Sequence, residues 1–312
     1  GPTTTDTALL IGILDPDGFL GGALRLDPAK SREAFARLES PLGVDQLVRH
    51  AWGMGVHNAA EGIFDIALRH GIDTRDFSLV VYGAAGPMLL PGILDVTPLR
   101  RVIVPPNPGL FSALGLLSSD LVFTDQRSSY ETLSADRAGA IDAIFVSMEQ
   151  ALLERLKLSR ADVRMERSFD GRLAGQLQNT PFVPVPDGTI DEAALARMIE
   201  SFHDVYEQRT GNRVSMLPVQ AVTYRVQAIV AADKVQYPTI ERRRPGAAPV
   251  LKPKTFHHLA DGPVQGVEAR REELLAGDEI VGPAVVREDL STTFVPIGRR
   301  LVVGDHGEFY IS

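Results

Sequence analysis

The fold is decided by the stretch FSLVVYGAAGP, residues 77–87. Its first half, 77–82, is short and nearly continuous in apolar residues, as is typical of a buried strand. The small residues Gly83, Ala84, Ala85 and Gly86 permit a tight turn, and Pro87 suits the first position of a helix. The stretch therefore predicts a strand, a glycine loop and a helix in succession.

The same order repeats downstream in RVIVPPNPG, residues 101–109. Residues 101–104 predict a second strand, the prolines predict a stiff turn, and 111–117 predict a helix of small residues. Asn107 tolerates unusual backbone angles, so it could lie at the edge of a cleft; the alternative is a purely structural turn. Alternation of strands and helices predicts an α/β sheet layer.

Other elements follow from periodicity and turn signals. Apolar residues three and four apart over 43–70 predict a long amphipathic helix. A strand is expected at 9–14 and helices at 28–40, 139–158 and 191–209, with further strands near 163–169, 172–185 and 219–231. The polar stretch 125–136 indicates a domain boundary. Residues 237–254 predict a proline-rich linker that contains the charged surface run 241–244, and the residues after it predict an all-β C-terminal segment.

Composition narrows the class of protein. The 312 residues are 44% hydrophobic and 23% charged, which is enough for two globular domains. A formal net charge of -8 provides no basic surface for nucleic acid or anionic lipid. The absence of cysteine excludes disulfides and thiol nucleophiles. Residues 8–14 lack the basic flank of a signal peptide, so we expect a cytoplasmic protein, and the missing initiator Met suggests further sequence upstream.

No catalytic residue and no metal site can be assigned from the residues alone. His57 and Glu61 lie four apart on the long predicted helix, but no third ligand accompanies them, so a structural histidine is the favoured interpretation. Hydroxyls at 291–293 have no assignable base and are expected to satisfy backbone groups in a turn. His203 is expected on a solvated helix face.

Three stretches together resemble one family. They are LDPDGFLGG with LRLD (14–27), residues 76–120 with the glycine turn and VPPNPGLFSALGLL, and LAGDEIVGPAVV through STTFVPIG (275–298). In this order they are similar to the hydantoinase A / 5-oxoprolinase large subunit, a group that includes N-methylhydantoinase A and subunits of acetone and acetophenone carboxylase.

The resemblance implies a fold and a site. It implies the second half of an actin- and sugar-kinase-like (RNase H-like) ATPase domain over residues 1–130, followed by a β-rich α+β C-terminal domain over 131–312. ATP and Mg are the implied cofactors, although the two Asp-Gly-Gly-Thr-like phosphate and metal loops of the family are not found in this chain. Nucleotide binding maps onto Gly83, Ala84, Ala85, Gly86 and Pro87, with Asn107 as a further candidate.

The implied function is part of an ATP-dependent enzyme that activates an amide or enolate oxygen by phosphoryl transfer. Such enzymes open cyclic amides, such as a hydantoin or 5-oxoproline, or carboxylate ketones, and both reactions stay open here. The alternative is a non-catalytic assembly or regulatory subunit, favoured by Ala84 and Leu89, where the family commonly has a second glycine and a histidine. The expected partners are a hydantoinase B-like subunit, the missing N-terminal half and a small-molecule substrate.

Overall fold

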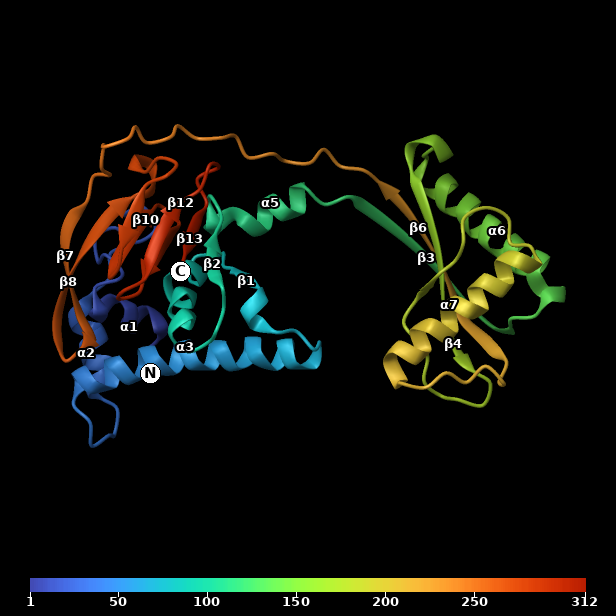
Figure 1. Ribbon diagram of the computed structural model, residues 1–312, viewed down its shortest axis with the longest axis horizontal. Coiled ribbons are helices and arrows are strands. Elements are labelled where there is room, and N and C mark those ends of the chain that lie inside the picture. Colours follow the sequence, from blue (N-terminus) through green and yellow to red (C-terminus); the bar gives the residue numbers. More distant parts are fainter. The chain divides into compact units, whose positions relative to one another are not determined.

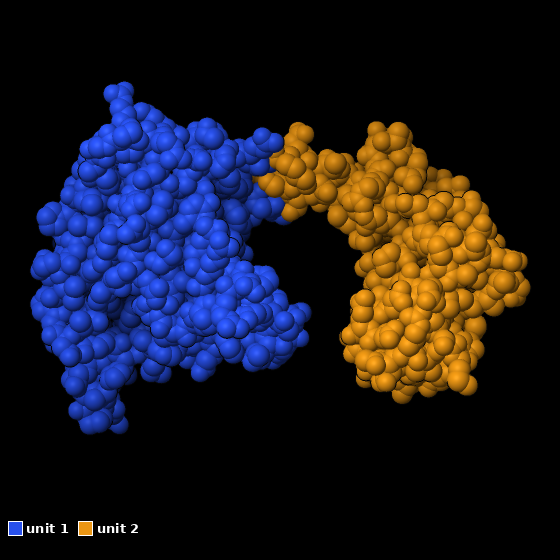
Figure 2. All heavy atoms as spheres, viewed as in Figure 1, with its two compact units in different colours: residues 1–116, 235–312 blue, residues 117–234 orange.

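The computed structural model describes residues 1–312, which form two compact units. Unit 1 contains Gly1–Leu116 and Val235–Ser312, and unit 2 contains Leu117–Lys234 (Figure 2). Both ends of the chain therefore belong to unit 1. The two units are defined by their compactness alone. They do not test the domain boundary expected at residue 130, which stays a prediction.

Unit 1 begins with three helices, α1 (Thr4–Ile11), α2 (Pro28–Ala36) and α3 (Val44–Arg69). The strand expected at 9–14 is wrong, because Thr3 and Asp6 form a capping box that starts α1, and Gly12 ends it in the left-handed region. The apolar run is buried against α3 and β7 as part of a helix. A short apolar run has no period that separates strand from helix. The long helix at 43–70 is confirmed as α3, which runs along one side of unit 1 (Figure 1).

The first sheet of unit 1 joins strands from both ends of the chain. Its order is β1 (Ser78–Val80), β2 (Arg101–Val104), β13 (Phe309–Ile311), β12 (Arg300–Val303) and β9 (Glu279–Val281). Strands β1 and β2 are parallel, with Leu79 opposite Val102, and β13 pairs antiparallel with β2. The two strands predicted at 77–82 and 101–104 are confirmed, and the all-β C-terminal segment completes their sheet.

A second sheet of unit 1 has the order β11 (Ser291–Val295), β10 (Ala284–Glu288), β8 (Gly262–Arg270) and β7 (Lys252–Ala260). Val285 and Phe294 of this sheet pack with α1 and α2, whereas Val286 and Val295 pack with the first sheet. The second sheet therefore lies between the N-terminal helices and the first sheet. The shorter elements of unit 1 are η1 (Thr74–Asp76), α4 (Gly86–Leu89), η2 (Leu90–Asp95), η3 (Pro108–Leu110), α5 (Phe111–Leu117) and η6 (Arg271–Glu273).

Unit 2 is an antiparallel sheet with two helices packed against it. The sheet has the order β3 (Leu121–Thr132), β6 (Val219–Val230), β4 (Arg164–Leu173) and β5 (Val183–Pro184), and the helices are α6 (Ala138–Leu156) and α7 (Glu192–Thr210). Short 3-10 turns are η4 (Ala135–Arg137) and η5 (Arg160–Asp162). Phe145 of α6 and Tyr224 of β6 meet in the core with ring centroids 5.0 Å apart.

The predicted helices and the strand at 219–231 of unit 2 are confirmed, but two details differ. The polar residues of 125–132 lie in β3, an edge strand whose side chains are largely exposed, and do not form turns. A polar edge strand is common because it protects the sheet from further pairing. Of the strand expected at 172–185, residues 172–173 form the end of β4 and Val183–Pro184 form β5.

The connection from unit 2 back to unit 1 is an extended segment, as expected for 237–254, until β7 starts at Lys252. The interpretation of 241–244 as a solubilising surface run is wrong for Arg243. Its guanidinium donates to both oxygens of Asp278, at 2.7 and 2.6 Å, and the Asp278 side chain is fully buried. This bidentate ion pair holds the connecting segment against the start of β9. The whole is a mixed α/β fold, and none of its helices has the length and apolar composition needed to span a bilayer.

Candidate functional site

The glycine loop follows β1, as the sequence predicts. Gly83 has a φ of +81°, a left-handed conformation that glycine adopts without strain. A Cβ at this position would meet nothing within 4 Å, so conformation alone accounts for the glycine. Ala84 and Ala85 are exposed, and α4 follows with Pro87 in its first turn. Helix α4 has only 4 residues, because the chain tightens into the 3-10 helix η2, where Pro91 supplies no N–H.

The proline loop follows β2 and lies beside the glycine loop. Asn107 has φ 50° and ψ 52°, the left-handed region that asparagine tolerates better than most residues. The N–H of Gly83 donates to the carbonyl oxygen of Pro108 at 2.7 Å. Since β1 and β2 are parallel neighbours, their carboxyl ends lie at the same edge of the sheet. This edge is where open α/β sheets usually bind ligands.

The turn between β10 and β11 approaches the proline loop and the N-terminal turn region. A Cβ on Gly109 would lie 3.0 Å from the Cβ of Leu290 and 3.1 Å from its carbonyl oxygen. A Cβ on Gly21, from the N-terminal turn region, would lie 3.7 Å from the Cβ of Asp289. The three stretches that carry the sequence resemblance therefore converge at Asp289 and Leu290.

Two cavities open on either side of this turn. The smaller, about 50 Å³, contains Ala84 on one wall and Asp15 and Ser291 on others. The larger, about 700 Å³, is lined by Asn107, Gly109, Leu110, Arg270, Arg271, Glu272, Glu288, Asp289 and Leu290. Its volume is within the range of small-molecule sites. The structure thus brings Ala84 and Asn107 to adjoining cavities that share residues 288–290.

A largely buried ion pair lines the larger cavity, and its carboxylate also lines the smaller one. Arg271 Nε lies 3.2 Å from Glu288 Oε1, and both side chains are nearly inaccessible. Nη1 of Arg271 donates to the Gly307 carbonyl at 2.8 Å, and the guanidinium lies 3.7 Å from the centre of the Phe309 ring. Burial raises the pKa of the Glu288 carboxyl despite Arg271, and burial lowers the pKa of Arg271.

A second charged group holds the N-terminal turn region against the sheet. Arg287 lies 3.1 Å from Asp15 and 2.8 Å from Glu268, and Lys254 lies 3.2 Å from the same Glu268 oxygen. Burial of Glu268 would raise its pKa, but Arg287 and Lys254 together lower it. The four side chains alternate in charge, so Asp15 helps to position the stretch that begins at residue 14.

The hydroxyls of 291–293 differ from expectation. Ser291, Thr292 and Thr293 are buried in β11, and the Oγ of Ser291 and Oγ1 of Thr293 have no hydrogen-bond partner. The expectation that these hydroxyls satisfy backbone groups is therefore wrong for Ser291 and Thr293. Ser291 also lines the cavity that contains Ala84. An unpaired buried hydroxyl beside a cavity is a position where a polar ligand group would be stabilised.

Comparison of the chain with known protein families agrees with the convergence of these three stretches. The model of the hydantoinase/oxoprolinase family matches residues 1–125, and that of the hydantoinase/oxoprolinase C-terminal domain matches residues 129–311. The chain belongs to the hydantoinase/oxoprolinase family. Nearly every residue lies within one of the two matches, so the resemblance is not confined to the three quoted stretches.

Individual relatives of the family are distant in sequence and longer. The chain is 24% identical to the acetone carboxylase beta subunit of Xanthobacter autotrophicus, over 99% of this chain and 46% of that relative. It is 24% identical to the caprolactamase subunit alpha of Pseudomonas jessenii, over 96% of this chain and 44% of that relative. A nucleotide-free structure of acetone carboxylase matches with a TM-score of 0.83 and 22% identity, over 99% of this chain and 46% of that one. The chain spans less than half the length of these relatives.

Histidines contribute little to the site. His57 Nδ1 contacts the Gly53 carbonyl at 2.8 Å within α3, in agreement with a structural role. His203 is 4% exposed, so the expected solvated position is wrong; it packs beside Phe202 in α7, and burial lowers its pKa. No group of three or more His, Asp or Glu side chains lies close enough to hold a metal ion.

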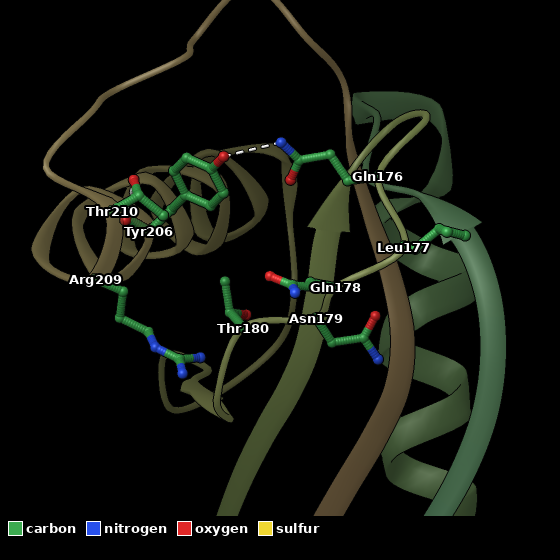
Figure 3. Close-up of a pocket in the computed structure, with 8 residues that line it drawn as sticks. All are labelled: Gln176, Leu177, Gln178, Asn179, Thr180, Tyr206, Arg209 and Thr210. Atoms are coloured by element: carbon green, nitrogen blue, oxygen red, sulfur yellow. Dashed lines mark hydrogen bonds between the residues drawn. The ribbon is translucent and has the colours of Figure 1, made fainter.

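Another cavity, about 730 Å³, lies in unit 2 between the loop after β4 and the end of α7 (Figure 3). It is lined by Gln176, Leu177, Gln178, Asn179, Thr180, Tyr206, Arg209 and Thr210, and Gln176 Nε2 donates to the Tyr206 hydroxyl at 2.9 Å. Its only charged side chain, Arg209, is exposed. We place the candidate site in unit 1, because there separate stretches of the chain converge around buried charges.

Sequence reasoning identified the loops of this site but missed Arg271, Glu288 and Arg287. A signal was present in the stretch AVVRE, residues 284–288, where two charges end an otherwise apolar strand. Charged residues at the end of a buried strand must be paired or face a cavity. Their partners come from distant positions, which the sequence pattern alone does not pair.

Proposed function

We propose that this chain supplies one wall of the nucleotide cleft of an ATP-dependent enzyme. In this proposal residues 1–130 include the second half of an actin- and sugar-kinase-like ATPase domain. The observation that carries it is the convergence of three family stretches where two parallel strands end, with Ala84 and Asn107 lining adjoining cavities. Gly83, Ala85, Gly86 and Pro87 complete the loop that the nucleotide would approach.

The residues present fit part of a nucleotide site. The exposed backbone at Ala84 and Ala85 leaves room for close approach, and the unpaired Ser291 hydroxyl offers a donor to a polar ligand group. The carboxamide of Asn107 can both donate and accept beside the larger cavity. These groups suit the uncharged adenosine portion. The triphosphate and its Mg would be held by residues of another polypeptide segment.

The proposed chemistry is phosphoryl transfer to an amide or enolate oxygen. When bound, ATP would supply the phosphoryl group: the amide or enolate oxygen would form a bond to the γ-phosphorus while the bond to the β-phosphate oxygen breaks and ADP is released. The phosphorylated oxygen would then be a better leaving group, or would hold the substrate in its enol form. The relatives named above include both a ketone carboxylase and a caprolactamase, so ring opening and carboxylation are both retained. The contribution of this chain is to position the nucleotide and exclude water from one side.

The second candidate function is a non-catalytic assembly or regulatory subunit. The observation that favours it is the methyl group of Ala84, which occupies the cavity wall where the family commonly has glycine. Leu89 likewise supplies no polar group where a histidine is common. In this alternative the fold is kept for subunit contacts and nucleotide chemistry is lost.

We infer that the active assembly contains two further components, a hydantoinase B-like subunit and a polypeptide equivalent to the first half of the longer relatives. We further infer a cytoplasmic location, since the substrates implied by the family are metabolites. Each component is testable by co-purification with this chain at defined stoichiometry.

The test is calorimetric titration with Mg-ATP and Mg-ADP, first with the chain alone and then with these components reconstituted. The proposal expects heat of binding only in the reconstituted assembly, because the chain has one wall of the cleft. Absence of binding in an assembly shown to be folded and associated would overturn it and favour the non-catalytic subunit. Binding by the chain alone, unaffected by its partners, would also contradict a divided cleft.

A further inference from the structure

Strand β1 is the edge of the first sheet, and one side of its backbone has no partner. The Val81 N–H donates to Ile103 of β2, and Phe77 accepts from Arg100. Successive residues of a strand direct their N–H and C=O groups to alternate sides. Residues 77, 79 and 81 therefore pair with β2, whereas Ser78, Val80 and Tyr82 present both groups to the open edge.

The open edge is short and apolar. Phe77, Val80 and Tyr82 are 50%, 45% and 49% exposed. Proteins normally protect an edge strand by keeping it short or by placing lysine, proline, a bulge or a covering segment on it. Strand β1 has only 3 residues, but residues 77–82 contain no lysine and no proline. A short apolar edge of this kind is suited to pairing with another strand.

Two helices extend past the open edge with exposed apolar side chains. Leu79 packs against Val56 and Ala60 of α3, while Tyr82 contacts Phe111 of α5 with ring centroids 5.2 Å apart. Residues 79 and 82 point to opposite faces of the strand, so α3 and α5 flank β1 from opposite sides. In Figure 1 both helices continue beyond β1. Toward their C-terminal ends, α3 exposes Phe64 and Leu68, and α5 exposes Leu116 and Leu117.

We propose that the open edge of β1 receives an apolar strand from the polypeptide equivalent to the first half of the longer relatives, inserted between α3 and α5. The proposal rests on the proposed function, in which such a polypeptide completes the cleft. Its support is length: more than half of the acetone carboxylase beta subunit lies outside the matched region, while 99% of this chain is matched. A strand there would have both faces covered by helices, which a sheet with parallel strands requires.

The occupant is defined by this geometry. Its backbone pairs with Ser78, Val80 and Tyr82, and its side chains alternate between Phe64 and Leu68 on one face and Leu116 on the other. It is therefore a strand of β-branched or aromatic residues that is apolar on both faces, and not an alternating polar strand. The docked strand extends the sheet beside the glycine loop, because that loop begins where β1 ends.

Amide hydrogen exchange of the co-expressed assembly, compared with this chain alone, tests the proposal. The N–H groups of Ser78, Val80 and Tyr82 are expected to exchange at least about tenfold more slowly in the assembly. The Val81 N–H is the internal reference, because it is already bonded to β2. Unchanged exchange at the three open-edge positions in a verified assembly would overturn the proposal. Protection in this chain alone that rises with its concentration would assign the edge to a second copy and also overturn it.

Variants give an independent readout. Val80→Pro removes an N–H that does not pair with β2, and we expect it to weaken association at least about tenfold. Tyr82→Arg keeps the backbone N–H of residue 80 and places a charge between α3 and α5. It therefore tests the proposal even if Val80→Pro does not fold. The control Met216→Arg changes an equally apolar, 93% exposed side chain in unit 2 and is expected to associate like the wild type.

Three results decide between the possibilities. Weak association of both edge variants, with the control unaffected, supports strand addition. Wild-type association of Tyr82→Arg, with its fold verified by circular dichroism, overturns it. If the assembly protects the N–H groups of the β1 edge from exchange but does not bind Mg-ATP, the proposed function is overturned and the docking surface is retained. The two failures are therefore distinguishable.

Discussion

The N–H of Gly83 donates a 2.7 Å hydrogen bond to the carbonyl oxygen of Pro108. This bond joins the loop after β1 to the loop after β2, although α4, η2 and β2 separate the two residues in the sequence. The Gly83 N–H is consequently occupied and cannot bind a ligand. Any N–H group that this loop donates to a nucleotide must therefore come from Ala84, Ala85 or Gly86, since Pro87 has none.

Filling the small cavity should remove ligand binding without unfolding the protein. Ala84→Leu places a larger side chain on the cavity wall, and we expect Mg-ATP affinity of the reconstituted assembly to fall at least about tenfold. The matched control is Ala151→Leu, an equally exposed alanine of α6 that lines neither cavity of the site. Calorimetry with both variants checks the result. Equal affinities for the two would remove Ala84 from the site.

The two possible roles of Asn107 can be separated by substitution. Asn107→Gly keeps the left-handed backbone and deletes the carboxamide, whereas Asn107→Val forces a β-branched residue into that conformation. We expect Asn107→Val to lower the free energy of unfolding by about 1–3 kcal/mol. Asn107→Gly should change it by less and lower nucleotide affinity. Urea denaturation and calorimetry measure the two effects, and a glycine variant with unchanged affinity leaves only the structural turn.

Asp278 is expected to stabilise the fold in a pH-dependent manner. Burial alone would raise its pKa, but hydrogen bonds from Arg243 and the Leu275 N–H outweigh burial and hold the pKa below its ordinary 3.8. A lowered pKa adds stability above about pH 3.8 that is lost as the pH falls through the folded-state pKa. Asp278→Asn should cost about 3 kcal/mol at pH 7 and remove this loss. Urea denaturation from pH 7 to pH 3 checks both, and an unchanged pH profile would contradict the assignment.

Glu288 should show the opposite dependence. Burial raises its pKa above the ordinary 4.5, so its contribution to stability is largest below that pH and is lost as the pH rises through the folded-state pKa. Relative to Glu288→Gln, the wild type should lose stability on going from pH 4.5 upward. The control is Glu272→Gln, because a hydrogen bond from Arg270 lowers the pKa of Glu272 and reverses the sign. Difference slopes of the same sign for both variants would contradict this account.

Much of the local structure could be predicted, because its causes are local. The apolar stripe of α3, the strands before both loops and the left-handed Asn107 follow from periodicity, small residues and proline spacing. The shortening of α4 follows from Pro91. Helix α1 was missed because the short apolar run at residues 8–14 has no decisive period, and the capping box of Thr3 and Asp6 settles the conformation.

The remaining features depend on contacts between distant residues. The sequence does not show that β13 pairs with β2, or that Arg243 finds a buried carboxylate 35 positions away. The Arg271 and Glu288 pair likewise requires that η6 and β10 be adjacent. The site loops were therefore predictable one by one, whereas the ion pair that lines the cavity beside them was not.

The two strands that enter and leave unit 2 are antiparallel neighbours, with Leu121 opposite Val230, and Lys234 donates to the Ser118 carbonyl at 2.8 Å. The chain thus enters and leaves unit 2 at adjacent positions, and the sheet of unit 1 can form without unit 2. Unit 2 could therefore be exchanged or lost as one segment during evolution, with a short peptide joining its ends, while the loops around Gly83 and Asn107 keep their positions.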